Sequence, residues 1–242
     1  MKLLALVNSS FKNILNKGPH SSFIIPLMTI IEYLTSFNRK ERFLLIGQML
    51  GNEPFHLAPD MLQKIAGMLG VPPPDEYFAA MDYHLDWIAA SLDLAAKNDE
   101  GPRMRDINCI RATQEDVDFL IAFEDEDKLT HIVMIEAKGD TAFSQKQLNS
   151  KATRLTAIFG NEGDQWPSVV PHFIICSPRT PTRIKINHLP NFLLNNENNA
   201  ILWFELNMPT NLQKVTQCDA SGKPLNKGSY WKVENITKRA TN

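Results

Sequence analysis

The strongest constraint on the fold is a short apolar run, Ile132–Ile135, that leads directly into Glu136, Ala137 and Lys138. Such a run is typical of a strand covered on both faces. A second run, "PHFIICS" at 171–177, has the same character. Because side chains alternate along a strand, Glu136 and Lys138 point to the same face. The sequence therefore predicts a sheet with helices on both faces, and a charged pair at the end of one of its buried strands.

Other segments complete an expected α/β fold with a mixed central sheet. Strands are expected at 105–112, 116–123, 131–138, 171–177 and 200–206. The polar turn "EDEDKLT" makes an antiparallel hairpin of the second and third strands. Helices are expected at 26–34, 36–51, 58–71, 71–97 and 141–160, with Ser36 or Asn38 capping the second and Gly51 and Gly160 ending the second and the last. Within 71–97, apolar residues recur at helical spacing: Phe78, Met81, Leu85, Ile88 and Leu92.

The chain divides into three expected parts. Residues 1–36 form an N-terminal helical segment, 37–206 form the α/β core with a helical insertion at 51–98, and 207–242 form an extension whose β-hairpin turns at Asp219–Gly222. With 43% apolar and 21% charged residues, a soluble globular protein is expected. The start "MKLLALV" is too short to span a membrane, and three scattered cysteines suit a reducing cytoplasm.

Charge is distributed unevenly along the chain. Residues 115–127 carry seven acids and no base. Residues 165–196 carry Arg179, Arg183 and Lys185 and no acid, and the chain from Thr210 onward carries six bases and two acids. An acidic spot between basic segments suits an anionic partner held near a metal site, whereas the ordinary interpretation of each segment alone is solvated surface.

Folding the expected hairpin about Asp127 places Asp118 opposite Glu136. Two carboxylates this close require a compensating cation, and Mg²⁺ commonly uses one or two carboxylates together with waters and phosphate oxygens. Lys138 would then lie beside an activated water or the phosphate. Asp116 is a rival for the first ligand because it shares a strand face with Asp118. The simpler alternative is a cross-strand salt bridge between Glu136 and Lys138.

These residues resemble the motif of the PD-(D/E)XK nucleases, which have the restriction-endonuclease-like fold. The similarity lies in Asp118 followed by Glu136-Ala137-Lys138 on a hairpin, and in the order helix, three strands, helix, strand over about 37–50 and 105–206. It implies that Asp118, Glu136 and the Ala137 carbonyl bind Mg²⁺ or Mn²⁺ and that Lys138 is the catalytic lysine. It also implies supporting roles for Glu41 on the first helix and for Gln145 or Gln147 on the helix after the motif.

The resemblance implies a metal-dependent nuclease with DNA as the expected substrate and no membrane partner. Basic residues in the later segments would hold the nucleic-acid backbone: Arg179, Arg183, Lys185, Lys223, Lys227 and Lys232. The alternative is a catalytically inactive member of the same fold that binds nucleic acid or protein. In that case the helical insertion would be a partner-binding or homo-oligomerisation module.

Overall fold

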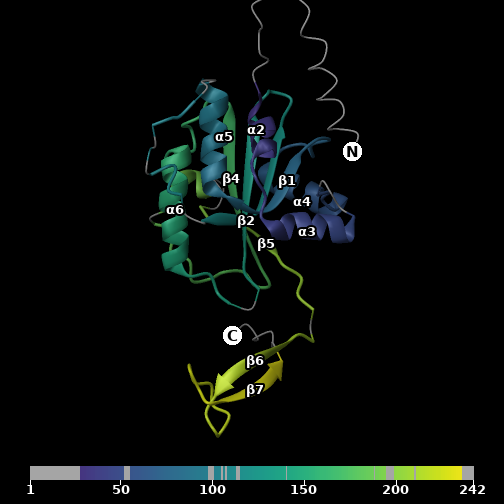
Figure 1. Cartoon of the computed structure of the whole chain (residues 1–242), viewed down its shortest axis with the longest axis vertical. Coiled ribbons are helices and arrows are strands. Elements are labelled where there is room, and N and C mark those ends of the chain that lie inside the picture. Colours follow the sequence, from purple (N-terminus) through teal and green to yellow (C-terminus); the bar gives the residue numbers. More distant parts are fainter. Residues whose placement is uncertain are drawn as a thin grey trace, which may run out of the picture.

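The computed structural model describes residues 28–51, 55–97, 101–104, 106, 108–112, 115–139, 141–187, 189–194, 199–209 and 211–235. Its centre is a five-stranded sheet of β1 (Phe78–His84), β2 (Asp116–Glu124), β3 (Thr130–Ala137), β4 (Val169–Ser177) and β5 (Leu202–Glu205), in that spatial order (Figure 1). Strand β2 is antiparallel to both of its neighbours, β1 and β3, and β3, β4 and β5 are parallel. The expected mixed sheet is confirmed.

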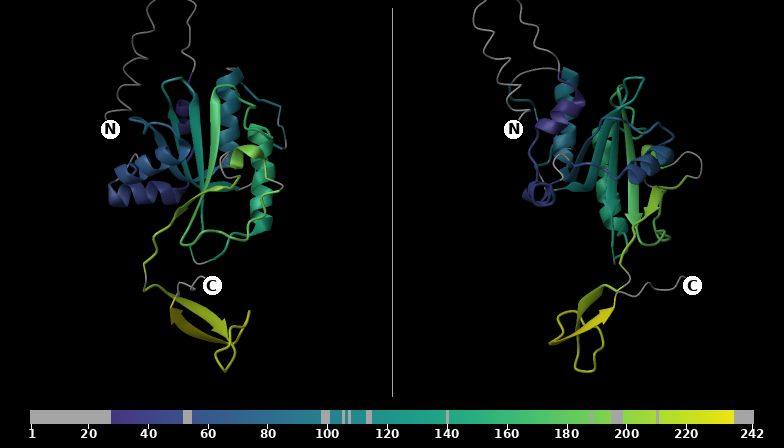
Figure 2. Two further views of the ribbon diagram at one scale, coloured as in Figure 1. Left: turned by 180° about the vertical axis from the view of Figure 1, so that it is seen from behind. Right: turned by 90° about the vertical axis from the view of Figure 1, so that its right-hand side faces the viewer.

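Helices cover both faces of this sheet. The larger core packs β-strand side chains against α2 (Ile30–Ser36), α5 (Leu85–Lys97) and α6 (Gln145–Phe159). The smaller core lies on the opposite face beneath α4 (Pro59–Leu69), and the right-hand view of Figure 2 shows the sheet between α4 and the α2–α5 side. Helix α3 (Glu41–Leu50) contacts β1, and the short 3-10 helix η1 (Asn191–Leu193) contacts β4.

The β2–β3 hairpin has the register expected from the sequence. Phe119 pairs with Ile135 at one end of the ladder and Glu124 with Thr130 at the other. Strand β4 is buried along most of its length, as a central strand should be. The C-terminal hairpin is also confirmed, as a separate two-stranded sheet of β6 (Gln213–Cys218) and β7 (Tyr230–Asn235).

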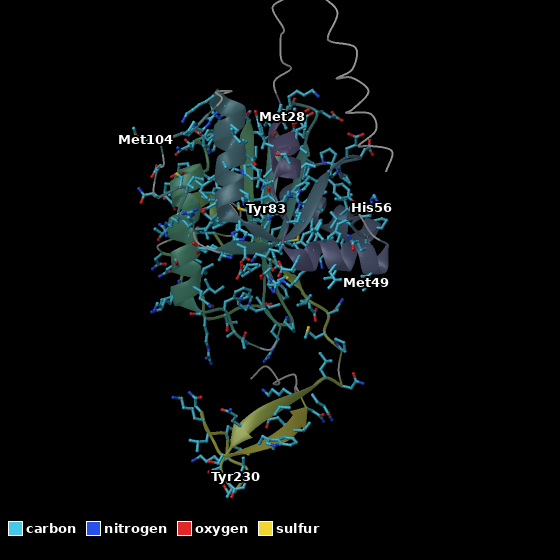
Figure 3. All side chains as sticks on the ribbon, in the orientation of Figure 1. Met28, Met49, His56, Tyr83, Met104 and Tyr230 are labelled. Atoms are coloured by element: carbon cyan, nitrogen blue, oxygen red, sulfur yellow. The ribbon has the colours of Figure 1, made fainter. Side chains whose placement is uncertain are left out.

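The expected continuous helix over 71–97 is wrong, because its first half contains strand β1. Phe78 and Met81 belong to the strand, whereas Leu85 and the later apolar positions belong to α5. Pairing with β2 satisfies backbone groups that would otherwise form a free sheet edge. Tyr83 is fully buried in the centre of the core, where its hydroxyl donates to the Leu34 carbonyl at 2.9 Å (Figure 3). Residues 51–98 therefore contribute a sheet strand as well as helices.

The expected strand at 105–112 is also wrong for the residues that the structure describes there. Residues 108–109 form a turn, and the Asp106 carbonyl accepts from the N–H groups of Cys109 and Ile110. The segment is held by side chains: Arg154 donates to the Asn108 carbonyl at 3.0 Å, and Asp86 accepts from the Ala112 N–H at 2.7 Å. Because these groups take its backbone bonds, no neighbouring strand is needed.

Several boundaries also differ from expectation. Lys40 is the N-cap of α3, because Ser36 ends α2 and the Asn38 side chain accepts instead from the Arg39 N–H. The left-handed Gly51 does end α3, at φ 66°. Helix α6 begins at Gln145 rather than 141 and ends at Gly160 as expected. Residues 1–27, including the expected start of the first helix, lie outside the described residues.

Within the described ranges, the helices are all too short or too polar to span a bilayer.

Candidate active site at the fork between β2 and β3

The candidate site lies where β2 and β3 separate. Their ladder ends at the pair Phe119–Ile135. Beyond it β2 continues alongside β1, with Val117 opposite Tyr83, while β3 continues alongside β4, with Ala137 opposite Cys176. The two strands thus form a fork, and Asp118 and Glu136 are the first residues on its two arms.

Asp118 connects the two strands at the point where they separate. Its Oδ2 atom accepts a hydrogen bond from the Ala137 N–H at 2.6 Å. The expected proximity of Asp118 to the Glu136–Lys138 segment is therefore present in the structure. Asp118 makes no ion pair with a described residue, so its carboxylate retains an oxygen that can bind a cation.

Glu136 is held by two lysines from different elements. Lys138 Nζ lies 3.3 Å from Glu136 Oε1, and Lys151 on α6 forms an ion pair with Glu136 Oε2. Lys151 Nζ also donates to the Asp116 carbonyl at 2.6 Å and thereby connects the two arms of the fork. The Glu136 side chain is 16% exposed, which leaves it within reach of solvent and ligands.

Lys151 is a residue of the site that the sequence did not single out. Its side chain is 11% exposed. It follows Leu148 by three residues and precedes Leu155 by four, so it occupies a position of the buried stripe of α6. A lysine at such a position needs a buried anionic partner, and this spacing was the available signal.

Asp116, the rival for the first ligand, is engaged elsewhere. Its carboxylate forms an ion pair with Lys40, the N-cap of α3. Asp118 is therefore the better placed of the two aspartates to face Glu136.

The remaining expected site residues are not joined to the fork by any contact among described residues. Glu41 is exposed at the start of α3, and its neighbours Lys40 and Arg42 make the ion pairs to the sheet. Gln147 is exposed one turn before Lys151 on α6. Gln145 has a structural contact: its side-chain amide accepts from the Lys185 N–H at 2.8 Å and donates to the Lys185 carbonyl at 3.0 Å.

The two carboxylates affect a neighbouring thiol. Burial and, secondarily, the negative charges of Asp118 and Glu136 together raise the pKa of Cys176 to about 11. Cys176 lies beside the fork on β4, where its carbonyl accepts from the Lys138 N–H at 2.9 Å. Both carboxylates thus contribute to one local negative field, which is the condition that favours a bound cation.

The donor set of the fork suits a hard divalent cation. It offers the Asp118 and Glu136 carboxylates and the backbone oxygens at the end of β3, which are the ligand types that Mg²⁺ and Mn²⁺ prefer. In the part of the chain that is described, no three His, Cys, Asp or Glu side chains gather as a complete ligand cage. Two carboxylates are enough for Mg²⁺, which retains several waters.

A basic segment leaves the sheet at the same end as the fork. Strands β3 and β4 are parallel, so Glu136 and Ser177 lie at neighbouring strand ends. The Ser177 hydroxyl donates to the Arg179 carbonyl at 2.8 Å, and Gln145 fixes Lys185. Between these anchors Arg179, Arg183 and Lys185 are exposed.

Comparison of the chain with protein-family models, curated proteins and solved structures gave no match.

Proposed function

We propose that this protein is a metal-dependent nuclease with a restriction-endonuclease-like core of the PD-(D/E)XK type, and that it hydrolyses phosphodiester bonds of DNA. The observation that carries the proposal is the meeting of Asp118 with the Glu136-Ala137-Lys138 segment at the fork. Three unpaired cysteines are compatible with the cytoplasm as its compartment.

The order of elements differs in one respect from the predicted helix, three strands, helix, strand: the first strand is β1 at Phe78–His84, and α5 lies between it and β2. The later part supports the proposal, because the antiparallel β2–β3 hairpin is followed by α6 and then by β4, which is parallel to β3. This arrangement packs α6 close enough to the fork for a side chain near the middle of the helix to reach it. Lys151 is the group that does so.

Each residue at the fork has a distinct proposed role. Asp118, Glu136 and the Ala137 carbonyl would hold Mg²⁺ or Mn²⁺, which supplies charge neutralisation at the phosphate and a lowered pKa of bound water. Lys138 places an ammonium group next to Glu136, where it can orient the attacking water and stabilise charge that develops on the phosphate. Lys151, which is also bonded to the Asp116 carbonyl, fixes the orientation of the Glu136 carboxylate through an ion pair.

The basic segment is proposed to hold the substrate. Arg179, Arg183 and Lys185 are solvent-exposed at the end of the sheet that carries the fork. Guanidinium and ammonium groups bind phosphate oxygens and set the position of a nucleic acid without reading its sequence.

One observation favours the non-catalytic alternative. Two lysines already compensate the charge of Glu136, and Lys40 compensates Asp116, so these ion pairs would stabilise the fork without any metal. In that case the protein would bind nucleic acid through its basic segments and leave it intact.

A cleavage assay separates the two functions. Purified protein is incubated with supercoiled, linear and single-stranded DNA and with RNA, with Mg²⁺, Mn²⁺ or EDTA. We expect cleavage of at least one DNA form that requires the cation and falls at least 100-fold in Asp118→Asn and in Lys138→Ala.

The matched control is Asp127→Asn, at the turn end of the same hairpin, which should cut as wild type does. Wild-type protein that binds DNA but cuts none of the substrates would support the non-catalytic alternative. Cleavage that persists in both site variants would exclude the fork as the active site.

A further inference from the structure

The β6–β7 hairpin has one apolar face that no described part of the chain covers. In its register Val215 lies opposite Val233, and Gln217 lies opposite Trp231. The three apolar side chains of this face are 69%, 51% and 68% exposed for Val215, Val233 and Trp231. A two-stranded ribbon cannot bury such a face by itself, so the face is available for a partner.

The hairpin carries a net positive charge. Glu234 accepts from the Thr216 hydroxyl at 2.8 Å and pairs with Lys232 at 3.1 Å, and these contacts lower the pKa of its carboxyl. The Asp219 carboxylate accepts from the Ser221 and Lys223 N–H groups within its own turn. These two acids are outnumbered by the lysines of residues 213–235, which are Lys214, Lys223, Lys227 and Lys232.

The loop at the end of the hairpin anchors a lysine to the strand residue that pairs with the exposed tryptophan. Gln217, directly opposite Trp231, accepts from the Lys227 N–H through its side chain at 3.1 Å. The Cβ of any side chain at position 228 would lie 2.3 Å from the Cys218 carbonyl oxygen, so Gly228 lets the loop pack against β6. The Lys227 backbone is thus tied to the residue that pairs with Trp231.

A second exposed aromatic lies at the loop end of the hairpin. Tyr230 precedes Trp231 and is 57% exposed (Figure 3), and because side chains alternate along a strand it faces away from the Trp231 side. Lys223 is exposed in the loop between the two strands. Exposed aromatic rings together with lysines are the combination that binds unpaired nucleic acid, since rings stack on bases and ammonium groups contact phosphates.

We propose that the β6–β7 hairpin binds single-stranded nucleic acid, with Trp231 stacking on an unpaired base and Lys227 contacting the adjacent phosphate. A second copy of the chain is the competing occupant of this face, and the net positive charge of the hairpin favours an anionic partner over another positively charged hairpin.

The hairpin is connected to the fork by a short segment. Met208 Cε lies 3.5 Å from the position of a Cβ on Gly139, the residue after Lys138. Gln213 follows Met208 by five positions along the chain, so this part of the connection spans at most about 18 Å. Figure 1 shows the hairpin beyond the end of the sheet toward which β5 runs. Resting on the proposed function, this arrangement would deliver a single-stranded segment to the nuclease site.

The test measures binding without catalysis. Full-length Asp118→Asn protein is titrated into fluorescently labelled dT20 and into a labelled 20-base-pair duplex, in EDTA, with anisotropy as the readout. Adding Trp231→Ala should weaken dT20 binding about tenfold, the equivalent of one lost stacking contact. Binding of the duplex should change less than twofold.

Two further variants make the outcome specific. Trp231→Phe keeps a ring and should restore most of the dT20 affinity, whereas Val233→Ala, on the same face, should bind as the parent does. Equal weakening by Val233→Ala and Trp231→Ala, or no effect of Trp231→Ala, would overturn the proposal. Loss of a solution dimer in Trp231→Ala with unchanged dT20 affinity would also overturn it and assign the face to self-association.

These results are independent of the cleavage assay. Normal dT20 binding with no cleavage by wild type would contradict the nuclease proposal and leave the hairpin proposal intact. Cleavage by wild type, together with unchanged dT20 binding in Trp231→Ala, would support the nuclease proposal and contradict the hairpin proposal.

Discussion

Lys151 shows how a single buried amine can organise a charged site. It contacts the Glu136 carboxylate and the Asp116 carbonyl, which belong to different arms of the fork. In Lys151→Met both acceptors lose this amine while side-chain volume is kept, and Glu136 retains only the contact with Lys138. We expect the free energy of unfolding to fall by about 3 kcal/mol, as for a broken buried ion pair. The free energy of unfolding of both proteins is measured by urea denaturation.

The control for this prediction is Lys146→Met, an exposed lysine on the same helix. Its unfolding free energy should stay within about 0.5 kcal/mol of wild type. Equal stability of Lys151→Met and Lys146→Met would show that the buried amine does not stabilise the fork.

His172 makes stability depend on pH at the opposite end of the hairpin. Its Nε2 lies 2.8 Å from His131 Nδ1, and His131 Nε2 lies 3.0 Å from the Asp125 carboxylate. Burial, and secondarily the neighbouring His131, lowers the pKa of His172 to about 4. Because the unfolded chain takes up this proton first, stability falls as the pH drops below about 6.5 and continues to fall to about 4.

Between pH 7.5 and 5.0 this one group should remove about 2 kcal/mol from the unfolding free energy. The hydrogen bond from His131 lowers the pKa of the Asp125 carboxyl. The contribution of Asp125 to the unfolding free energy is therefore lost only at pH values below 5.0. His172→Gln should therefore lose less stability than wild type over the same interval, measured by urea denaturation at both pH values. An identical loss in the two proteins would contradict this origin of the pH dependence.

Elements differ in how far the sequence alone predicts them. The β2–β3 hairpin and its register were predictable because an apolar run and a polar turn fix the pairing locally. Strand β1 was missed because its apolar residues continue the helical spacing of α5, and only pairing with β2 makes it extended. The site follows the same division: Asp118, Glu136 and Lys138 depend on the hairpin register, whereas Lys151 reaches them only once α6 has docked.

The segment at 106–112 is an element held by side chains instead of by a sheet. Asp86 accepts from the Arg111 and Ala112 N–H groups and pairs with Arg154, whose side chain is fully buried. Asp86→Ala would leave that guanidinium without its anion. We expect a loss of about 3–5 kcal/mol in unfolding free energy, measured by urea denaturation.

Asp93→Ala is the matched control on the same helix. Asp93 pairs with Lys97 and Arg103 but is 28% exposed, so its removal should cost about 1 kcal/mol or less. A loss as small for Asp86→Ala as for Asp93→Ala would show that Asp86 does not anchor the segment.

At the scale of the whole molecule, groups that suit a nucleic acid gather at one end. Parallel strands bring the fork and the start of the basic segment to the same edge of the sheet, and the connection to the β6–β7 hairpin passes Gly139 there. The titratable His131–His172 pair lies toward the other end of β3 and β4. The chain thus separates its proposed nucleic-acid surface from a region that affects stability.

The central claim is that the fork binds one divalent cation through Asp118 and Glu136. Its most direct test is Mn²⁺ titration followed by electron paramagnetic resonance, without nucleic acid. Wild type and Asp116→Asn should bind one Mn²⁺ with similar affinity, and Asp118→Asn and Glu136→Gln should bind it at least tenfold more weakly. Wild type that binds no Mn²⁺, or an Asp116→Asn variant that loses as much affinity as Asp118→Asn, would contradict the claim.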